Sequence, residues 1–480
     1  MELLLLILPV FLALAVFALP QNLVKAFGLI GGLASLIYAV SLAFCYDVTS
    51  GFHLISSGPW MMGITFNMGY DGISMMMVLL TNFLVPIILL SNYNRELASS
   101  KCFTSMVFLM QFGLLGVFLA MDGMLFYIFW EITLIPIYLI LVWFGAPERK
   151  PALIKFFIYT FFGSLFMLAS LIGLRSYGAL SFAIQDLYAV AVPAQAACWL
   201  VGGFFLAFAV KVPLFPFHNW QPDTYAVSPM AGTMLLSGIM LKMALYGMIR
   251  WMIPLFPEGI GSWVQPVIIL GVIGVVYGAV LAIRQNDMKK LFAFASLSHV
   301  GLIAAAIMVF DMDTLSGSIL QMVNHGAVAV ALFLCADIFE RRLGTRDLDQ
   351  LGGIAKQAPK FAFWFAVIAF ASVSVPFTSG FIGEFLLLKG LYSYNGIIGI
   401  VAGTTLILGA VYTFRAYQRS MFGEVKVASF PDLHWSEWTV FFVLTAVIVV
   451  LGVAPQLVIG YVEPSVKQLI ESIQTATIAK

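Results

Sequence analysis

Long apolar runs separated by short polar connectors continue along the whole chain. An α-helix needs about 20 mostly apolar residues to cross the roughly 30 Å hydrocarbon layer of a bilayer. The connectors hold most of the Pro, Asn, Asp, Lys and Arg residues. This pattern predicts an all-α, polytopic membrane protein. The following fourteen stretches are expected to span the membrane: 1–19, 26–46, 70–91, 103–120, 123–145, 153–174, 196–214, 229–252, 263–283, 291–309, 316–339, 361–389, 395–419 and 438–460.

The composition excludes several classes of protein. Apolar residues make up 62% of the 480 residues and charged residues only 10%, whereas soluble domains contain about 25% charged residues. The net charge of +1 gives no reason to expect a nucleic acid or another polyanion as a partner. The first stretch lacks a basic start and a small-residue cleavage site, so we expect a retained helix.

The cysteines do not form a metal-binding pattern. They lie far apart in the sequence, without C-x-x-C spacing, at Cys45, Cys102, Cys198 and Cys335. We therefore expect this chain to hold no zinc ion and no iron–sulfur cluster by itself.

The basic residues lie mainly in alternate connectors. Only Arg175, Arg250 and Lys389 follow even-numbered spans. Under the positive-inside rule, this split places both termini on the outer side of the membrane. Seventeen basic residues follow odd-numbered spans: Lys25, Arg95, Lys101, Arg149, Lys150, Lys155, Arg284, Lys289, Lys290, Arg341, Arg342, Arg346, Lys356, Lys360, Arg415, Arg419 and Lys426.

Six titratable residues lie within the predicted spans, where charge is costly. A charged side chain at the middle of a bilayer costs roughly 2.5–3.5 kcal/mol on insertion scales, so such residues are usually functional or paired. Asp71 and Asp337 lie nearer to span ends and are expected at the interface. The six are Glu131, Lys211, Lys242, His299, His325 and Glu384.

Two acids, two amines and two imidazoles on six separate spans favour a proton relay. Burial disfavours a charged lysine and a nearby carboxylate favours it, so Lys211 is expected to hold or release a proton according to the position of Glu131. We expect Lys242 to receive the proton next, followed by the histidines. The alternative is a structural role, in which these side chains only hold helices together.

Two predicted spans are interrupted beside these charges. Pro213 and Pro216 follow Lys211, and Pro376 and Gly380 precede Glu384. Proline removes a backbone donor and clashes with the preceding helical turn. Interrupted spans at corresponding positions are typical of inverted-repeat transporters, so we predict two inverted five-helix repeats, made of spans 4–8 and 9–13, with helices 7 and 12 broken.

At these residues, the sequence resembles the antiporter-like membrane subunits of respiratory complex I, the proton-pumping NADH–quinone oxidoreductase. Within that family it is most similar to the subunit M type, the counterpart of mitochondrial ND subunit four. The resemblance covers nearly the whole chain. Its most specific part is 125–145, followed by 155–168, and further matches are 212–229, 288–301, 324–342 and 380–385.

The resemblance implies a role for each of the six residues. By motif, Glu131 is similar to the fifth-helix glutamate of the family, Lys211 to its partner on the broken helix, and Lys242 to the central lysine. His299 and His325 resemble the linking histidines.

Two further positions refine the resemblance. Glu384 resembles the exit-side carboxylate, and it favours the M type because the L type carries a lysine there. Phe294 departs from the family pattern, which commonly has Tyr at this position, so any role of that hydroxyl is in doubt here.

The resemblance also implies partners and a location. NADH, FMN, iron–sulfur clusters and quinone are expected in partner subunits, with no cofactor in this chain. The expected partners are adjacent antiporter-like subunits, the long lateral helix of a neighbour, and lipid. The expected location is the bacterial inner membrane, with both termini periplasmic. The chain divides into N-terminal helices (1–102), two repeats (103–252 and 263–419) and a C-terminal helix with a tail (420–480).

Other functions compete with this interpretation. A cation/proton antiporter subunit of the Mrp type shares the fold and the Glu/Lys pair, and membrane subunits of related hydrogenases or ferredoxin-driven complexes are closer still. A passive scaffold would tolerate apolar residues at both Glu131 and Lys211. An autonomous redox enzyme is disfavoured because the chain has no cofactor-binding motif such as G-x-G-x-x-G in a strand–turn–helix context.

Overall fold

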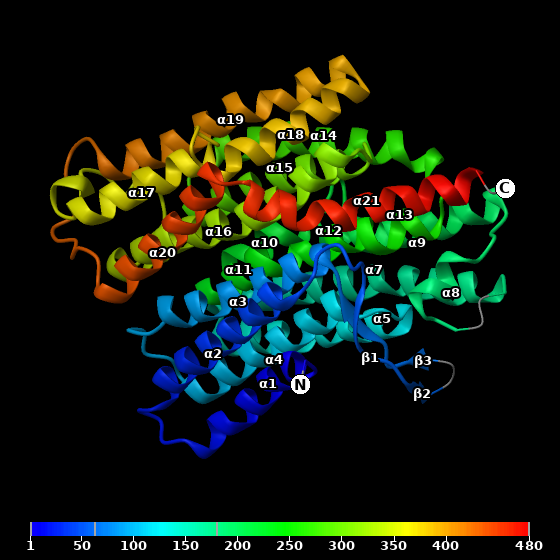
Figure 1. The fold of residues 1–480 in the computed structure, drawn as a ribbon. Coiled ribbons are helices and arrows are strands. Elements are labelled where there is room, and N and C mark those ends of the chain that lie inside the picture. The colour runs from blue at the N-terminus through cyan, green and yellow to red at the C-terminus, as the bar shows by residue number, and fades with distance from the viewer. Residues whose placement is uncertain (1, 62–63, 179–180, 479–480) are drawn as a thin grey trace.

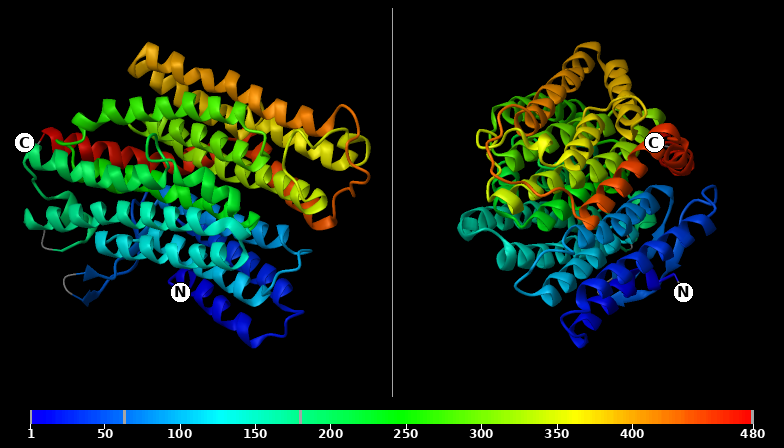
Figure 2. Two further views of the ribbon diagram at one scale, coloured as in Figure 1. Left: turned by 180° about the vertical axis from the view of Figure 1, so that it is seen from behind. Right: turned by 90° about the vertical axis from the view of Figure 1, so that its left-hand side faces the viewer.

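Most of the chain forms a bundle of helices lying side by side. The computed structural model describes residues 2–61, 64–178 and 181–478 (Figure 1). Residue 1 of the first predicted span and residues 479–480 of the predicted tail lie outside the described residues. Viewed from behind and from the side, the N-terminal helices occupy one flank of the bundle and α18 (Ser379–Tyr394) and α19 (Gly396–Met421) the opposite flank (Figure 2).

The helices of the first half are connected by short turns and loops. In chain order they are α1 (Leu4–Ala15) with the short 3₁₀ turn η1 (Val16–Ala18), α2 (Val24–Cys45), α3 (Gly72–Ser91), α4 (Ser100–Leu119), α5 (Gly123–Ile132), α6 (Leu134–Phe144), η2 (Pro147–Arg149), α7 (Lys150–Ser176), α8 (Ile184–Tyr188), α9 (Ala194–Lys211) and α10 (Trp220–Val227).

The second half contains the longest helix, α16 (Met312–Leu343). Its other helices are α11 (Met230–Leu235), the π-helical turn η3 (Leu236–Met240), α12 (Leu241–Gly247), the π-helical turn η4 (Met248–Met252), α13 (Ile253–Leu255), α14 (Gly261–Arg284), α15 (Met288–Ile307), η5 (Ile354–Lys356), α17 (Pro359–Ser372), α18, α19, α20 (Trp435–Val453) and α21 (Gln456–Ile478).

Four short strands lie in the connector between α2 and α3. They pair as two antiparallel ladders, β1 (His53–Ser56) with β4 (Met68–Tyr70) and β2 (Pro59–Met61) with β3 (Ile64–Thr65). The backbone N–H of Gly72, just after β4, donates to Ser465 Oγ of α21 at 2.9 Å. The C-terminal helix is therefore attached to the start of α3.

The helices match the predicted polytopic class. Among the described residues, 12 helices are long and apolar enough to span a membrane. The first and twelfth predicted spans correspond instead to shorter apolar helices, Leu4–Ala18 and Pro359–Ser372. The polytopic all-α fold is confirmed, whereas the count of fourteen spans and the inverted repeats stay predictions.

Polar residues in the connectors begin several of the helices. The side chains of Asp71, Asp122, Asp287 and Asp311 accept hydrogen bonds from backbone N–H groups in the first turns of α3, α5, α15 and α16. These N–H groups have no partner within the helix, so a short acidic side chain at this position stabilises the helix start. Polar residues in the connectors thus stabilise the starts of these four helices.

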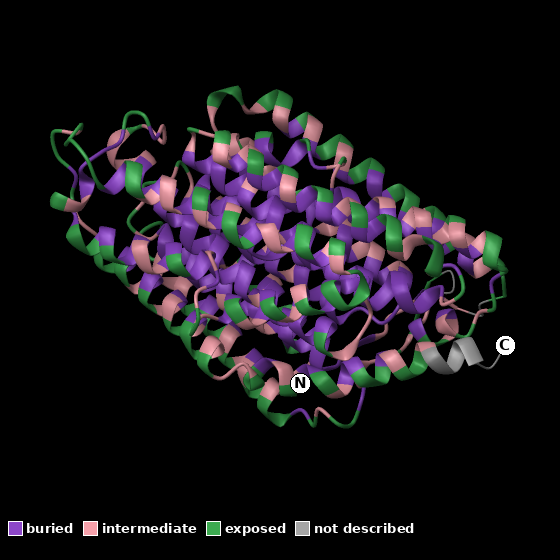
Figure 3. Ribbon diagram, turned by 90° about the horizontal axis from the view of Figure 1, so that it is seen from above, coloured by how far each residue is buried: buried purple, intermediate pink, exposed green. Residues whose placement is uncertain are grey.

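The helices differ in how far they are buried. Met230–Leu255 is buried along its whole length and α16 along nearly all of it, whereas most of α2, α19 and α20 is not. Buried residues fill the middle of the bundle and exposed ones line its edges (Figure 3). Large apolar side chains such as Phe44, Trp199 and Ile397 are exposed on these edges. Lipid accommodates such a surface, and water does not.

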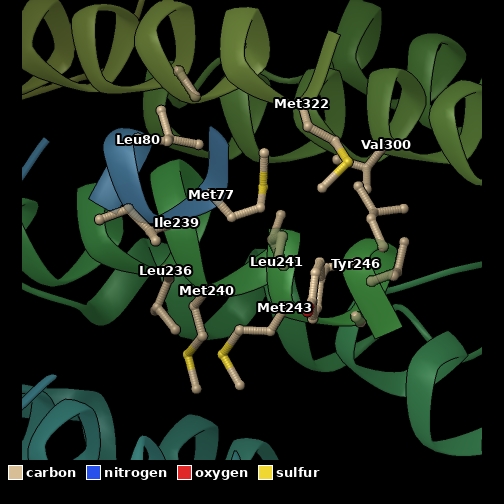
Figure 4. Close-up of a cluster of buried hydrophobic side chains, with 14 of the residues drawn as sticks. Met77, Leu80, Leu236, Ile239, Met240, Leu241, Met243, Tyr246, Val300 and Met322 are labelled. Atoms are coloured by element: carbon tan, nitrogen blue, oxygen red, sulfur yellow. The ribbon is translucent and has the colours of Figure 1, made fainter. Parts of the chain in front are cut away.

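Methionine-rich packing surrounds the central helix. Figure 4 shows Leu241 on the side of its helix that faces Met77 of α3 and Met322 of α16, with Met240 and Met243 pointing to the other side. All five side chains are buried. Flexible thioether side chains fill irregular gaps well, so they suit a core whose central helix is flanked by π-helical turns.

Candidate functional site

Lys242 lies at the centre of a hydrogen-bonded cluster. Its side chain is fully buried on α12. Its Nζ lies 2.8 Å from Nδ1 of His325 on α16, and it donates to the Ser237 carbonyl oxygen at 2.6 Å. Ser237 belongs to η3, the π-helical turn that precedes α12. A turn of this kind disturbs the regular backbone bonding of a helix, and here one of its carbonyls faces the ammonium group.

The imidazole of His325 connects the lysine to the next helix. Its Nε2 lies 3.0 Å from Oγ of Ser296 on α15. The Ser296 hydroxyl lies 3.4 Å from the Ser237 hydroxyl. Because Nδ1 faces an amine and Nε2 faces a hydroxyl, the ring can accept a proton at one nitrogen and release one from the other.

His299 and Glu384 form a second cluster, built by residues of α15, α16, α18 and α19. His299 Nδ1, on α15, lies 2.9 Å from Glu384 Oε1 on α18. Its Nε2 lies 3.2 Å from the hydroxyl of Tyr412 on α19. The Gln321 amide donates to the same carboxylate oxygen at 3.2 Å. Glu384 is buried, so these partners replace the water that a carboxylate normally binds.

A small cavity joins the two clusters. The rings of His299 and His325 are 6.3 Å apart between centroids, too far for direct proton transfer. A cavity of about 30 Å³ is lined by both histidines, Ser296 and Tyr412. A water molecule needs about 10–15 Å³ of such volume and two to four polar partners. The cavity therefore has the size and the lining to hold bridging water between the histidines.

Glu131 and Lys211 lie near each other without a direct ion pair. Their charges interact, but the Glu131 carboxylate has Ser164 and Tyr127 as its side-chain neighbours. Glu131 Oε1 and Lys211 Nζ are buried and have no hydrogen-bond partner. The Lys211 ammonium lies 5.4 Å from the ring centroid of Trp130, which is within cation–π range. Glu131 and Lys211 are thus close enough for their charges to interact, but they do not form a direct salt bridge.

The predicted helix breaks lie beside the charged groups. Lys211 is the last residue of α9, and Pro213 and Pro216 stand in the connector before α10. Pro376 lies between α17 and α18, and Gly380 is in the first turn of α18. A Cβ at position 380 would lie 2.7 Å from Ser374 Oγ, so a larger residue there would have to displace the Ser374 side chain.

Four buried polar residues of these clusters were not singled out from the sequence. Ser296 lies three residues before His299, on the same helix, and this spacing could have indicated it. Gln321 likewise precedes His325 by four residues. Tyr412 gave no such signal, because it meets His299 through tertiary packing, and neither did His218, whose ring packs against Phe215 and Tyr277. His218, in the connector before α10, is buried and its Nδ1 has no partner.

The structure adds partners for Asp71 and Asp337. Both lie near helix ends, and their side chains are buried within the protein. Their expected place at the membrane interface stays a prediction. Asp71 forms a buried ion pair with Arg250, which lies in η4. Asp337 pairs with Arg95 and Arg341. Hydropathy alone misses such pairs because it does not show which helices meet.

The site contains no cluster of metal-ligating side chains. Within residues 2–61, 64–178 and 181–478, no group of three or more His, Cys, Asp or Glu residues could hold a metal ion. The described cysteines are all free. What the site does contain is a set of acids, bases and hydroxyls, which exchange protons.

Comparison with known proteins assigns this bundle to a family. Residues 120–409 match the family described as NADH:quinone oxidoreductase/Mrp antiporter, TM. The chain belongs to this antiporter-like family. The matched segment contains all six titratable residues predicted from the sequence.

Relatives within the antiporter-like family cover most of the chain. NADH-quinone oxidoreductase subunit M of Rhodobacter capsulatus is 35% identical over 437 residues, covering 88% of this chain and 85% of that protein. NADH-ubiquinone oxidoreductase chain 4 of Arabidopsis thaliana is 35% identical over 474 residues, covering 96% and 95%. The chain is thus an antiporter-like subunit of the complex I type.

Solved structures show the same architecture. A chain of respiratory complex I from Thermus thermophilus with bound NADH superposes with a TM-score of 0.91 at 30% identity, covering 98% of this chain and 100% of that one. A chain of the Mrp complex from Dietzia sp. superposes with a TM-score of 0.88 at 20% identity, covering 98% and 99%. The second likeness concerns the fold alone.

Proposed function

We propose that this chain is a proton-translocating membrane-arm subunit of a respiratory NADH:quinone oxidoreductase. The observation that carries the proposal is the series of close contacts from Lys242 through His325 and His299 to Glu384. These groups lie inside a membrane-spanning bundle, where unpaired charge is costly. An amine, two imidazoles and a carboxylate in series suit the transfer of a proton.

The proposal assigns a direction of transfer to each contact in the series. A protonated Lys242 donates to Nδ1 of a neutral His325, and the resulting imidazolium donates from Nε2 toward Ser296. Water in the adjoining cavity carries the proton toward His299 and Tyr412. His299 then presents a proton from Nδ1 to Glu384. Each step moves one proton and leaves the donor ready to be refilled.

Glu131 and Lys211 act as the input of this relay. When the Glu131 carboxylate is charged and close, it favours the ammonium form of Lys211. When Glu131 withdraws or is neutralised, the buried ammonium is disfavoured and Lys211 releases its proton. The absence of a direct ion pair between them supports this role, since a locked salt bridge would hold the proton in place.

Redox chemistry takes place outside this chain in the proposal. NADH, FMN, iron–sulfur clusters and quinone are bound by partner subunits, and this chain contributes to the enzyme only as a subunit. The side chains of the site are proton carriers and do not form a redox centre. Coupling therefore reaches Glu131 and Lys211 through neighbouring charges or through motion.

Adjacent antiporter-like subunits and the lateral helix of a neighbour are the proposed partners in the membrane. An apolar groove of about 610 Å³ over α7, α9 and α14 supports this, since it is lined by Phe166, Trp199 and Trp263. A helix in this groove would also contact Pro216 and Phe217, in the connector that follows Lys211. The proposed location is a bacterial inner membrane, with both termini periplasmic.

The replacement of Lys211 by Met tests this function. The assembled complex is purified, its NADH-binding and quinone-binding subunits are verified, and proton uptake by proteoliposomes is followed with a pH-sensitive dye. Removing a proton-binding group from a relay should lower pumping about tenfold or more. Lys389→Met is the matched control, because Lys389 is exposed and pairs only with Asp313.

Two results would overturn the proposal. Pumping at the parental rate by the assembled Lys211→Met complex would exclude the relay. Co-purification with cation/proton antiporter subunits, and without subunits that bind NADH or quinone, would instead favour an Mrp-type function.

A further inference from the structure

Four unpartnered polar groups lie around the start of α10. The buried side chains of Lys211, Gln221 and Tyr225 each have polar atoms without a hydrogen-bond partner, and both amide atoms of Gln221 are unpartnered. Gln221 and Tyr225 are fully buried. The fourth is His218, in the connector just before this helix. Buried polar groups are nearly always satisfied by protein or by ordered water, so this concentration indicates a hydrated region.

The backbone brings this region next to Lys211. The indole N–H of Trp220 donates at 2.8 Å to the carbonyl of Val210, the residue before Lys211. Gln221 follows Trp220 directly, so the first turn of α10 is held against the end of α9. The helix break after Lys211 makes this possible, because it returns the chain beside the lysine.

The other end of the region meets the Lys242 cluster. Gln221 and Tyr225 are four residues apart and therefore lie on one face of α10. The Tyr225 hydroxyl has Gln221 and Ser237 as its side-chain neighbours but makes no direct hydrogen bond to either. The Ser237 hydroxyl lies 3.4 Å from Ser296, and the Ser237 carbonyl accepts from Lys242.

Apolar side chains pack α9 against α12, the helices that carry Lys211 and Lys242. Phe208 of α9 packs against Gly247 of α12 so closely that a Cβ on the glycine would lie 2.6 Å from its ring. The ring of Trp130 packs at a tilt against the same phenylalanine, with ring centroids 5.6 Å apart. The indole N–H of Trp130 is the one unpartnered polar group on these three residues, whereas Gln221 and Tyr225 of α10 supply three unpartnered polar atoms. The side chains of α10 therefore offer water more partners than this apolar contact does.

We propose that Gln221 and Tyr225 hold the water molecules that carry protons from Lys211 to the cluster of Ser237, Lys242 and Ser296. They are positioning residues: the proton leaves Lys211 Nζ as one N–H bond breaks, passes along water, and forms a new N–H bond on a neutral Lys242. One positive charge moves, and no group is oxidised or reduced. The inference rests on the proposed function of the chain.

Tyr225→Phe and Gln221→Leu in the assembled complex test the inference. Tyr225→Phe removes one hydroxyl and leaves the ring on Phe333, 5.7 Å away between centroids. Proton uptake by proteoliposomes should fall about tenfold in each variant, because the water loses a partner in a buried region. Tyr417→Phe is the matched control, since its hydroxyl binds only the Ala362 carbonyl on the far flank, and it should pump at the parental rate.

A solvent isotope measurement separates water positioning from a merely structural defect. If transfer through the water becomes limiting, D₂O should slow proton uptake by Tyr225→Phe more than uptake by the parent. An equal isotope effect would overturn the inference, as would parental pumping by both variants. A map of the complex that shows dry density between Lys211 and Tyr225 would also overturn it.

These outcomes are distinct from failure of the proposed function. If Lys211→Met pumps normally, the relay itself is wrong. If Lys211→Met fails to pump while both α10 variants pump at the parental rate, only the route through α10 is wrong.

Discussion

At the scale of single residues, the two lysines of the site have different surroundings. Lys211 lies near a carboxylate, whereas Lys242 is held by a carbonyl and an imidazole, which carry no negative charge. Both groups are buried. A charged, close Glu131 therefore keeps the proton on Lys211, and its withdrawal lets the proton pass toward Lys242, which gives the proposed relay a direction.

The buried ion pair of Asp71 and Arg250 lies outside the proposed relay, and we expect its loss to affect stability. The two side chains are 4% and 2% exposed. Asp71→Asn keeps an oxygen that can accept from the Ser74 backbone N–H, as Asp71 does at the start of α3, but it removes the charge. An unpaired buried arginine should destabilise the protein by about 3–5 kcal/mol. The check is the thermal denaturation temperature of the purified complex.

Asp313→Asn is the control for this prediction. Asp313 pairs with Lys389 at the surface, where both side chains are more than half exposed, so its loss should change the denaturation temperature little. Replacing both members of the buried pair, as in Asp71→Asn with Arg250→Met, should restore part of the stability. Equal effects of the two single Asp→Asn changes would contradict the buried-pair argument.

At the scale of elements, the irregular parts of helices position the site. The break after α9 places Lys211 at a helix end, and the π-helical turns flank the helix that carries Lys242. On α18, small residues allow close packing against α16, which carries His325 and Gln321. A Cβ at Gly383 would lie 2.4 Å from the Gln321 amide oxygen. Close helix contact through glycine is common in membranes.

Gly383→Ala should therefore disturb the site through helix packing. The added methyl group would displace Gln321, which donates to Glu384, and would separate α16 from α18. The expected cost is about 1–3 kcal/mol of stability. Thermal denaturation of the complex measures this cost, and proton uptake shows whether Glu384 still functions.

Gly403→Ala on α19 provides the matched comparison. A Cβ there would meet nothing within 4 Å. Alanine favours a helix over glycine by up to about 1 kcal/mol, so this variant should be as stable as the parent or more so. The packing argument fails if both substitutions have the same effect.

At the scale of the whole molecule, the two ends of the bundle face opposite sides of the membrane in the proposed orientation. The strands between α2 and α3 lie at one end, and the loop between α19 and α20 lies at the other (Figure 1). Ser57 and Glu424 are exposed positions in these two connectors. Positive charge is concentrated at the end that contains Glu424.

Cysteine labelling tests this orientation. The test uses a variant whose native cysteines are replaced by serine or alanine. In cells whose outer membrane is permeable and whose inner membrane is intact, Ser57→Cys should react with a membrane-impermeant thiol reagent. Glu424→Cys should react only after the inner membrane is opened. The opposite pattern would show that the orientation is inverted.

The sequence by itself determined the class of the protein and the six buried-span titratable residues from which the relay is proposed. The cost of transferring a side chain into a bilayer depends mainly on residue type, so apolar runs, the basic connectors and the six titratable residues can be recognised along one dimension. Proline beside Lys211 and Glu384 indicated the helix breaks for a similarly local reason.

Only the tertiary structure decided which of these groups meet. It joined Lys242 to His325 and His299 to Glu384, and it left Glu131 and Lys211 without a direct ion pair. It also buried Asp71 against Arg250 and added Tyr412 and Gln221 to the buried polar groups. These contacts depend on how each helix is rotated and packed against helices far away in the sequence. Hydropathy contains no information on rotation, because lipid-facing and buried positions of these helices are both apolar.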